Sequence, residues 1–168
     1  PTEISLAALP PGFRAFAAQM NEANSPEQDD ELDEAVLDGE KTASGIPLPF
    51  ADPAVGAGLF PERVLKVHSE RIDGMSDSAR KEDTIRLLSN MQLLDISEIA
   101  VSCTRRRLLL VLAKSGLVDL DGPGDDSRIA REEAEVLLES SVQHGDALRG
   151  IWPWNDDPRL LICNPPWL

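Results

Sequence analysis

The stretch Asn164-Pro165-Pro166-Trp167 contains groups that could form the floor of an active site. Two successive prolines fix the backbone φ angle and remove two N–H donors, so the neighbouring carbonyl groups are presented rigidly as acceptors. The Asn164 side-chain oxygen is one more acceptor, and Trp167 offers an aromatic face on which a flat ring could stack. The tetrapeptide alone does not establish a site, because the rest of the chain must supply the other half of the chemistry.

A glycine-containing turn is the second candidate. In FADPAVGAGLF, Asp52-Pro53 follow an apolar run, Gly56 and Gly58 are two residues apart, and a helix is expected to open directly after them. Glycines here allow a tight strand-to-helix turn and let a ligand lie against the backbone, where a Cβ would obstruct it. A Gly-x-Gly pair by itself is more often an ordinary turn, so its significance depends on the motifs that lie later in the chain.

Two carboxylates follow later apolar runs. Asp95 ends the run in MQLLDISEIA, where a carboxylate can accept hydrogen bonds from both vicinal hydroxyls of a ribose. Its distance from Gly58 exceeds the usual spacing of about 20 residues, partly because of the polar insert DGMSDSARKED, and a helix N-cap role for Asp95 is compatible with ribose binding. Asp146 ends a short strand in SSVQHGDALRG, and Ala147 and Leu148 after it supply an apolar surface for a ring.

An alternation of strands and helices is expected to position these residues. Apolar runs predict strands near 46–52, 91–96, 141–145 and 159–163, and helical periodicity predicts helices near 60–72, 79–90, 97–115 and 128–139. This order predicts an α/β fold, with a parallel sheet covered by helices. Pro47 and Pro49 conflict with a central strand because neither can donate to the sheet, which leaves open a later start for the first strand.

The chain is long enough for one domain with a core, and its N-terminal part differs from the rest. Of its 168 residues, 42% are hydrophobic. Residues 11–23 place Phe13, Phe16, Ala17 and Met20 on one face of a predicted docking helix. Residues 24–45 are acidic and lack aromatics, as in a linker or exposed arm. We therefore divide the chain into an N-terminal helix and arm at 1–45 and a core at 46–168.

Charge and composition restrict the classes of partner. The net charge is −14, with a nearly neutral middle (60–118, +2) between acidic flanks (1–59, −9; 119–168, −7). This balance argues against a large duplex-binding face on this piece. Neither a signal peptide nor a membrane-length apolar run is visible, so we expect a cytoplasmic protein.

A metal site is not expected from the sequence. Cys103, Cys163, His68 and His144 are far apart and lack the closely spaced pairs that are typical of tetrahedral zinc sites.

Taken in order, DPAVGAG, LLDISEIAVSCTRRRLLL, HGDAL and LLICNPPW resemble the motif set of S-adenosylmethionine-dependent methyltransferases that modify adenine N6 in DNA. Such enzymes occur in restriction–modification and phage-defence systems. The resemblance covers residues 46–168 and implies a Rossmann-like class I methyltransferase fold. It implies a cofactor site formed by Asp52, Pro53, Gly56, Gly58, Asp95, Ile96, Asp146 and Ala147, and a catalytic loop formed by Asn164, Pro165, Pro166 and Trp167.

The resemblance also gives the final tetrapeptide a chemical role. An exocyclic adenine amine is a poor nucleophile because its lone pair is delocalised into the ring. In the family, the equivalents of the Asn164 side-chain oxygen and the Pro165 carbonyl accept the two N–H groups, and an aromatic residue at the position of Trp167 stacks on the flipped base. Holding the amine in line with a methyl donor lowers the barrier by positioning.

The chain departs from the family in what surrounds these motifs. The sequence stops one residue after Trp167, whereas such enzymes continue with more of the sheet and a target-recognition region. We therefore expect further polypeptide or a partner chain to complete the sheet and to supply DNA recognition. The N-terminal family motif that closes over the methionine end of the cofactor has no convincing counterpart, KTASG at 41–45 being a faint candidate.

Three alternatives remain open. Protein-glutamine methyltransferases also use an Asn-Pro-Pro-aromatic loop, although Asp52-Pro53 and Trp167 favour DNA as the substrate. A winged helix-turn-helix is conceivable over residues 95–122, with Arg105–Arg107 opening a recognition helix and an acidic wing. A scaffold that binds cofactor without turnover is the third.

Overall fold

The computed structural model describes residues 41–150 and 152–163. The predicted helix at 11–23, the acidic stretch up to residue 40 and the whole catalytic loop, Asn164–Trp167, lie outside the described residues.

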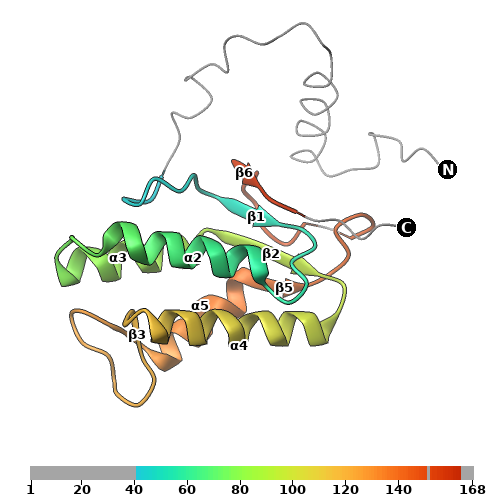
Figure 1. Cartoon of the computed structure of the whole chain (residues 1–168). Helices are drawn as coiled ribbons and strands as arrows, with labels where there is room; N and C mark the ends of the chain where they lie inside the picture. The colour runs from blue at the N-terminus through green and yellow to red at the C-terminus, as the bar shows by residue number, and fades with distance from the viewer. Residues whose placement is uncertain (1–40, 151, 164–168) are drawn as a thin grey trace, which may run out of the picture.

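The described chain has an α/β architecture built on a four-stranded parallel sheet (Figure 1). Its strands are β1 (Phe50–Asp52), β2 (Met91–Asp95), β5 (Val142–His144) and β6 (Leu160–Leu161), in the order β5-β2-β1-β6. This confirms the predicted α/β class and parallel sheet, and the arrangement is compatible with a Rossmann-like fold. β1 begins later than the predicted residue 46, directly after Pro49, which cannot donate to the sheet, and Phe50 N donates to Asn90 O (3.0 Å).

Four helices cover one face of the sheet (Figure 1). They are α2 (Leu59–Ile72), α3 (Asp77–Ser89), α4 (Glu98–Lys114) and α5 (Arg131–Ser141), all close to their predicted ranges. The chain moves from β1 to β2 to β5 in one direction, and right-handed crossovers in one direction place their helices on one side. The helices and strands bury a common core that includes Phe50, Leu65, Leu93, Leu108 and Leu138.

The opposite face of the sheet is crossed by the segment between β5 and β6. Gln92, 3% exposed, accepts a hydrogen bond from Trp152 Nε1 (3.1 Å) and donates one to the Asp156 carbonyl (2.9 Å). The Trp152 and Trp154 rings pack with their centroids 5.0 Å apart. A buried glutamine in a strand therefore ties the crossover segment to the sheet.

Residues 41–46, mostly assigned to the N-terminal arm from the sequence, contact the helices through a buried polar network. Ser44 Oγ hydrogen-bonds His68 Nδ1 (2.9 Å), and His68 Nε2 hydrogen-bonds Thr84 Oγ1 (3.1 Å). Asp83 Oδ1 accepts the backbone N–H of Ala43 (2.8 Å). The position of the boundary between arm and core stays a prediction.

Two features differ from expectation. A small parallel ladder, β3 (Val118–Asp119) with β4 (Ile129–Ala130), was not predicted, because two-residue strands carry no readable periodicity. The winged-helix alternative is wrong in its structural premise: Arg105–Arg107 lie in the middle of the continuous helix α4 and open no separate recognition helix.

Among the described residues, no helix is both long and apolar enough to cross a membrane.

Candidate functional site

The candidate residues that the structure describes gather at the carboxyl edge of the sheet. Because all four strands are parallel, the loops after them leave from the same edge. The chain order reverses between β1 and β6, since β2 and β5 lie on one side of β1 and β6 on the other. Ligands of open α/β sheets bind at such a switch point, outside the carboxyl ends of the strands. The glycine turn follows one of these two strands and the Asn-Pro-Pro-Trp stretch follows the other.

The glycine turn depends on conformations that other residues disfavour. Gly56 has φ 55° and Gly58 has φ 78°, both left-handed. A Cβ on Gly58 would lie 3.0 Å from Cγ2 and Oγ1 of Thr104, and the Thr104 hydroxyl donates to the Gly56 carbonyl (2.8 Å). Thr104, on α4, therefore packs against the turn and stabilises it through this hydrogen bond. Sequence reasoning missed it, because a lone threonine inside a helix carries no signal of this contact.

Asp95 connects the turn to the second strand. Its Oδ2 accepts the backbone N–H of Gly56 (2.8 Å), and its Oδ1 accepts that of Ser97 (2.9 Å). The N-cap of α4 is Ser97, whose side chain accepts from Ala100 N (3.3 Å), so the N-cap role considered for Asp95 is wrong. Asp95 remains half-buried at the rim, and a carboxylate has lone pairs beyond the two used here.

Asp52 is a buried carboxylate with an unused oxygen. Its side chain is fully buried, Oδ1 accepts from Ala54 N (3.1 Å), and Oδ2 has no hydrogen-bond partner among the described residues. Burial, together with the negative charge of Asp95, raises the pKa of Asp52 to about 6. An unpaired buried acceptor at a strand end is costly and suits a ligand that carries an N–H donor or a positive charge.

Asp146 lies two residues beyond the end of β5 and orders the loop after that strand. Its Oδ1 accepts from Leu148 N (2.9 Å) and Arg149 N (3.2 Å). Gly145 N donates to the Asp95 carbonyl (2.9 Å), so the loops after β2 and β5 are joined. Ala147 is partly exposed beside them.

Large apolar side chains are exposed around this edge. Ile96 is 69% exposed and Leu148 51%. Leu59, Phe60 and Ile99, in the first turns of α2 and α4, are exposed as well. Single exposed apolar residues are common, but a concentration of them in the loops after β1, β2 and β5 is typical of a surface that contacts a flat apolar ligand.

The end of β6 approaches the same place. Ile162 N donates to the Ala51 carbonyl (2.9 Å), which continues the pairing with β1. Burial and the charge of Asp52 both raise the pKa of the Cys163 thiol, so this thiol stays protonated and weakly nucleophilic. Cys163 directly precedes Asn164, where the described residues end. Pro53, partly exposed, follows Asp52 at the adjoining strand end.

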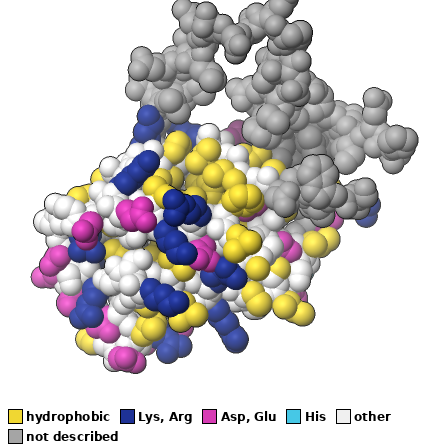
Figure 2. All heavy atoms as spheres, viewed as in Figure 1, with side chains coloured by type: hydrophobic (Ala, Val, Ile, Leu, Met, Phe, Trp, Pro, Cys, Tyr) yellow, Lys and Arg dark blue, Asp and Glu magenta, His cyan; other side chains and the backbone are white. Residues whose placement is uncertain are grey.

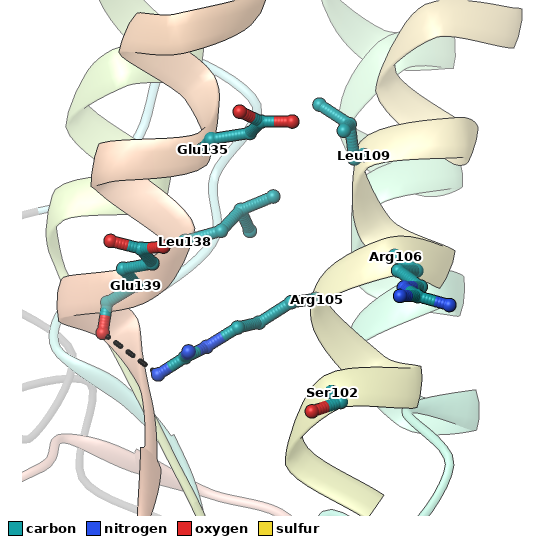
Figure 3. Close-up of a pocket in the computed structure, with 7 residues that line it drawn as sticks. All are labelled: Ser102, Arg105, Arg106, Leu109, Glu135, Leu138 and Glu139. Atoms are coloured by element: carbon teal, nitrogen blue, oxygen red, sulfur yellow. Dashed lines mark hydrogen bonds between the residues drawn. The ribbon is translucent and has the colours of Figure 1, made fainter. Parts of the chain in front are cut away.

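A separate pocket lies between α4 and α5 and contains none of the candidate residues (Figure 3). Its volume is about 210 Å³. The Arg105 side chain crosses it to the end of α5, where its guanidinium donates to the carbonyls of Val142 (2.6 Å) and Glu139 (3.3 Å). Arg105 therefore satisfies carbonyls at a helix end. The pocket is lined by Ser102, Arg105, Arg106, Leu109, Glu135, Leu138 and Glu139.

The described residues contain no cluster of three or more His, Cys, Asp or Glu side chains that could hold a metal ion.

Comparison of the chain with models of protein families, with curated proteins and with solved structures gave no significant match.

Proposed function

We propose that residues 46–168 are the cofactor-binding and catalytic part of a class I, S-adenosylmethionine-dependent methyltransferase that modifies the N6 amine of adenine in DNA. The observation that carries the proposal is the hydrogen bond between Asp95 and Gly56, which joins the glycine turn to the ribose-type carboxylate at the switch point of a parallel sheet. The motif that could position an adenine amine follows the neighbouring strand β6 in the sequence.

The described residues fit such a cofactor in four ways. The unused Oδ2 of Asp52 suits the ammonium group of its methionine part. The turn at Gly56 and Gly58 leaves the backbone open to close approach. Asp95, between the exposed Ile96 and the glycine turn, suits the ribose, and Asp146 with Ala147 suits the amino edge and flat face of the adenine. When bound, the cofactor would supply an electrophilic methyl group.

The remaining chemistry would fall to the catalytic loop. Asn164 and the Pro165 carbonyl would hold the target amine by its N–H groups, and Trp167 would hold the extruded base by stacking. DNA is the proposed substrate, with further polypeptide or a partner chain supplying target recognition and the rest of the sheet. A cellular role in restriction–modification or phage defence, in the cytoplasm, follows from the resemblance and is part of the proposal.

The test is transfer of a tritiated methyl group to plasmid DNA by the completed enzyme, with the product nucleoside identified by mass. Asn164→Ala should abolish transfer while cofactor affinity stays within a few-fold, because Asn164 contacts the target amine. Trp167→Ala should weaken binding of the extruded base by roughly 1–3 kcal/mol. Trp154→Ala is the matched control, since it removes a tryptophan that packs on Trp152 outside the loop.

Wild-type turnover by Asn164→Ala would remove the catalytic assignment. Appearance of the methyl group on a glutamine of a protein substrate would replace DNA by the protein-glutamine alternative. Cofactor binding without transfer to either substrate would favour the scaffold alternative.

A further inference from the structure

The outer faces of α2 and α4 form one basic surface. The two helices are joined by an ion pair between Glu62 Oε2 and Arg107 Nη1 (2.6 Å). Arg63 and Lys66 are exposed on α2, and Arg106 and Lys114 on α4. Figure 2 shows Lys and Arg side chains grouped over the part of the molecule that carries these helices. We call Arg63, Lys66, Arg106, Arg107 and Lys114 the basic face.

Carboxylates on the same helices neutralise the positive charge of the basic face only in part. Glu62 already contacts Lys66 and Arg107, and these two cations lower its pKa. In the part of the chain that the structure describes, Arg63 and Arg106 have no carboxylate within ion-pair distance. The basic face therefore has positive charge to spare in a chain whose net charge is −14.

The most acidic stretch of the sequence is attached close to this surface. Residues 27–40, EQDDELDEAVLDGE, carry eight carboxylates and no basic side chain. The chain enters the described part at Lys41, and two residues later Ala43 N donates to Asp83 on α3. Arg71, in the last turn of α2, donates to the Ser44 carbonyl (2.7 Å). The described residue to which the acidic stretch is attached, Lys41, is therefore followed at once by contacts with α3 and with the last turn of α2.

The acidic stretch is long enough to reach every cation of the basic face. Fourteen residues span up to about 45 Å when extended, whereas α2, with 14 residues, is about 21 Å long. One exposed ion pair contributes only about 0–1 kcal/mol. A tether, however, holds the two charged segments at an effective concentration on the order of millimolar, so several weak pairs can act together.

We propose that residues 27–40 dock on the basic face of α2 and α4 in the same molecule. The contact is electrostatic, and the individual carboxylates exchange among the cations of the basic face. It withdraws the basic face from polyanions, so nucleic acid would have to be bound elsewhere on the protein.

A zero-length carbodiimide cross-link tests this in the full chain, because it joins a lysine amine to a carboxylate only when the two are in contact. The chain has four lysines, Lys41, Lys66, Lys81 and Lys114, which makes the map simple. At low salt, Lys66 and Lys114 should couple to carboxylates of 27–40, and the yield should fall about five-fold or more in 1 M salt, where screening is strong. Lys81 on α3, which donates to the Asp125 carbonyl (2.8 Å), should not couple.

Two matched variants and one internal control complete the experiment. D30N/E31Q/D33N should reduce the coupling to Lys66 and Lys114, whereas E132Q/E133Q/E139Q, which neutralises three carboxylates of α5, should leave it unchanged. The coupling of Lys66 to Glu62 should form in all samples. Formation of that internal link without any link to 27–40, or equal coupling of 27–40 to Lys81, would overturn the proposal.

Two further outcomes would also overturn it. Links that join labelled to unlabelled chains in an isotopic mixture would show that the acidic stretch docks on a second copy. Loss of the links when a stoichiometric amount of duplex DNA is added would show that the basic face prefers nucleic acid.

Discussion

The Asp95 carboxylate accepts the backbone N–H of Gly56 at 2.8 Å, although 39 residues separate them in the chain. This hydrogen bond joins the loops after β1 and β2 and fixes the distance between the glycine turn and the candidate ribose acceptor.

The first prediction concerns cofactor affinity. Asp95→Ala should weaken S-adenosylmethionine binding by about 1.5–3 kcal/mol, the range for a hydrogen bond to a charged group, because both the acceptor and the tie to Gly56 are lost. Calorimetry measures the affinity, and Asp126→Asn, at an exposed loop position, is the control. Equal affinity in Asp95→Ala would remove the ribose assignment, and tighter binding of NAD in a parallel titration would favour a dinucleotide site.

The second prediction concerns Asp52 and pH. Its pKa rises from 3.8 to about 6 on folding, so the unfolded chain loses this proton at a lower pH than the folded chain. The contribution of Asp52 to the free energy of unfolding therefore decreases as pH rises from about 4 to about 6. Asp52→Asn should therefore gain stability over the wild type with rising pH, by about 2–3 kcal/mol at pH 7. Urea denaturation at pH 4.5 and 7.5 measures it. A gain that does not change with pH would contradict the burial of a charge at this position.

The third prediction concerns the left-handed turn. Gly58→Ala should destabilise the fold by about 2 kcal/mol or more, because it combines a positive φ with a Cβ placed 3.0 Å from Thr104. Gly74→Ala is the matched control, since a Cβ there meets nothing within 4 Å. Thermal denaturation compares the two, and adding Thr104→Ser, which removes the crowding methyl group but keeps the hydroxyl, should recover part of the loss. Equal melting temperatures in the two alanine variants would contradict the turn geometry.

The fourth prediction concerns the buried histidine. Burial lowers the pKa of His68, with the nearby Asp83 acting in the opposite direction. Below its ordinary pKa of 6.5 the unfolded chain therefore binds a proton that the folded chain resists, and stability should fall as pH decreases. His68→Gln can keep hydrogen bonds to Ser44 and Thr84 but cannot titrate, so its stability should decrease less between pH 7 and pH 5. An identical pH dependence in both proteins would show that His68 is not the responsible group.

Much of the fold could be predicted because its signals are local. Short apolar runs, separated by stretches with helical periodicity, indicated a parallel sheet with helices, and the structure contains both. Parallel strands present their carboxyl ends at one edge, so Asp52, Asp95 and Asp146 could be expected near one another from their places at the ends of predicted strands. Pro47 and Pro49, which cannot donate to the ladder, left open a later start for the first strand, and β1 does begin later, at Phe50.

Tertiary structure decided what depends on contacts between distant residues. The sequence indicated a tight turn at Gly58, but only the packing of α2 on α4 brings the Thr104 side chain into contact with that turn. Likewise, neither the strand order β5-β2-β1-β6 nor the buried pairing of Ser44, His68 and Asp83 follows from spacing along the chain. Periodicity reports which face of an element is apolar, whereas the identity of the element that covers that face is set by the packing of the whole core.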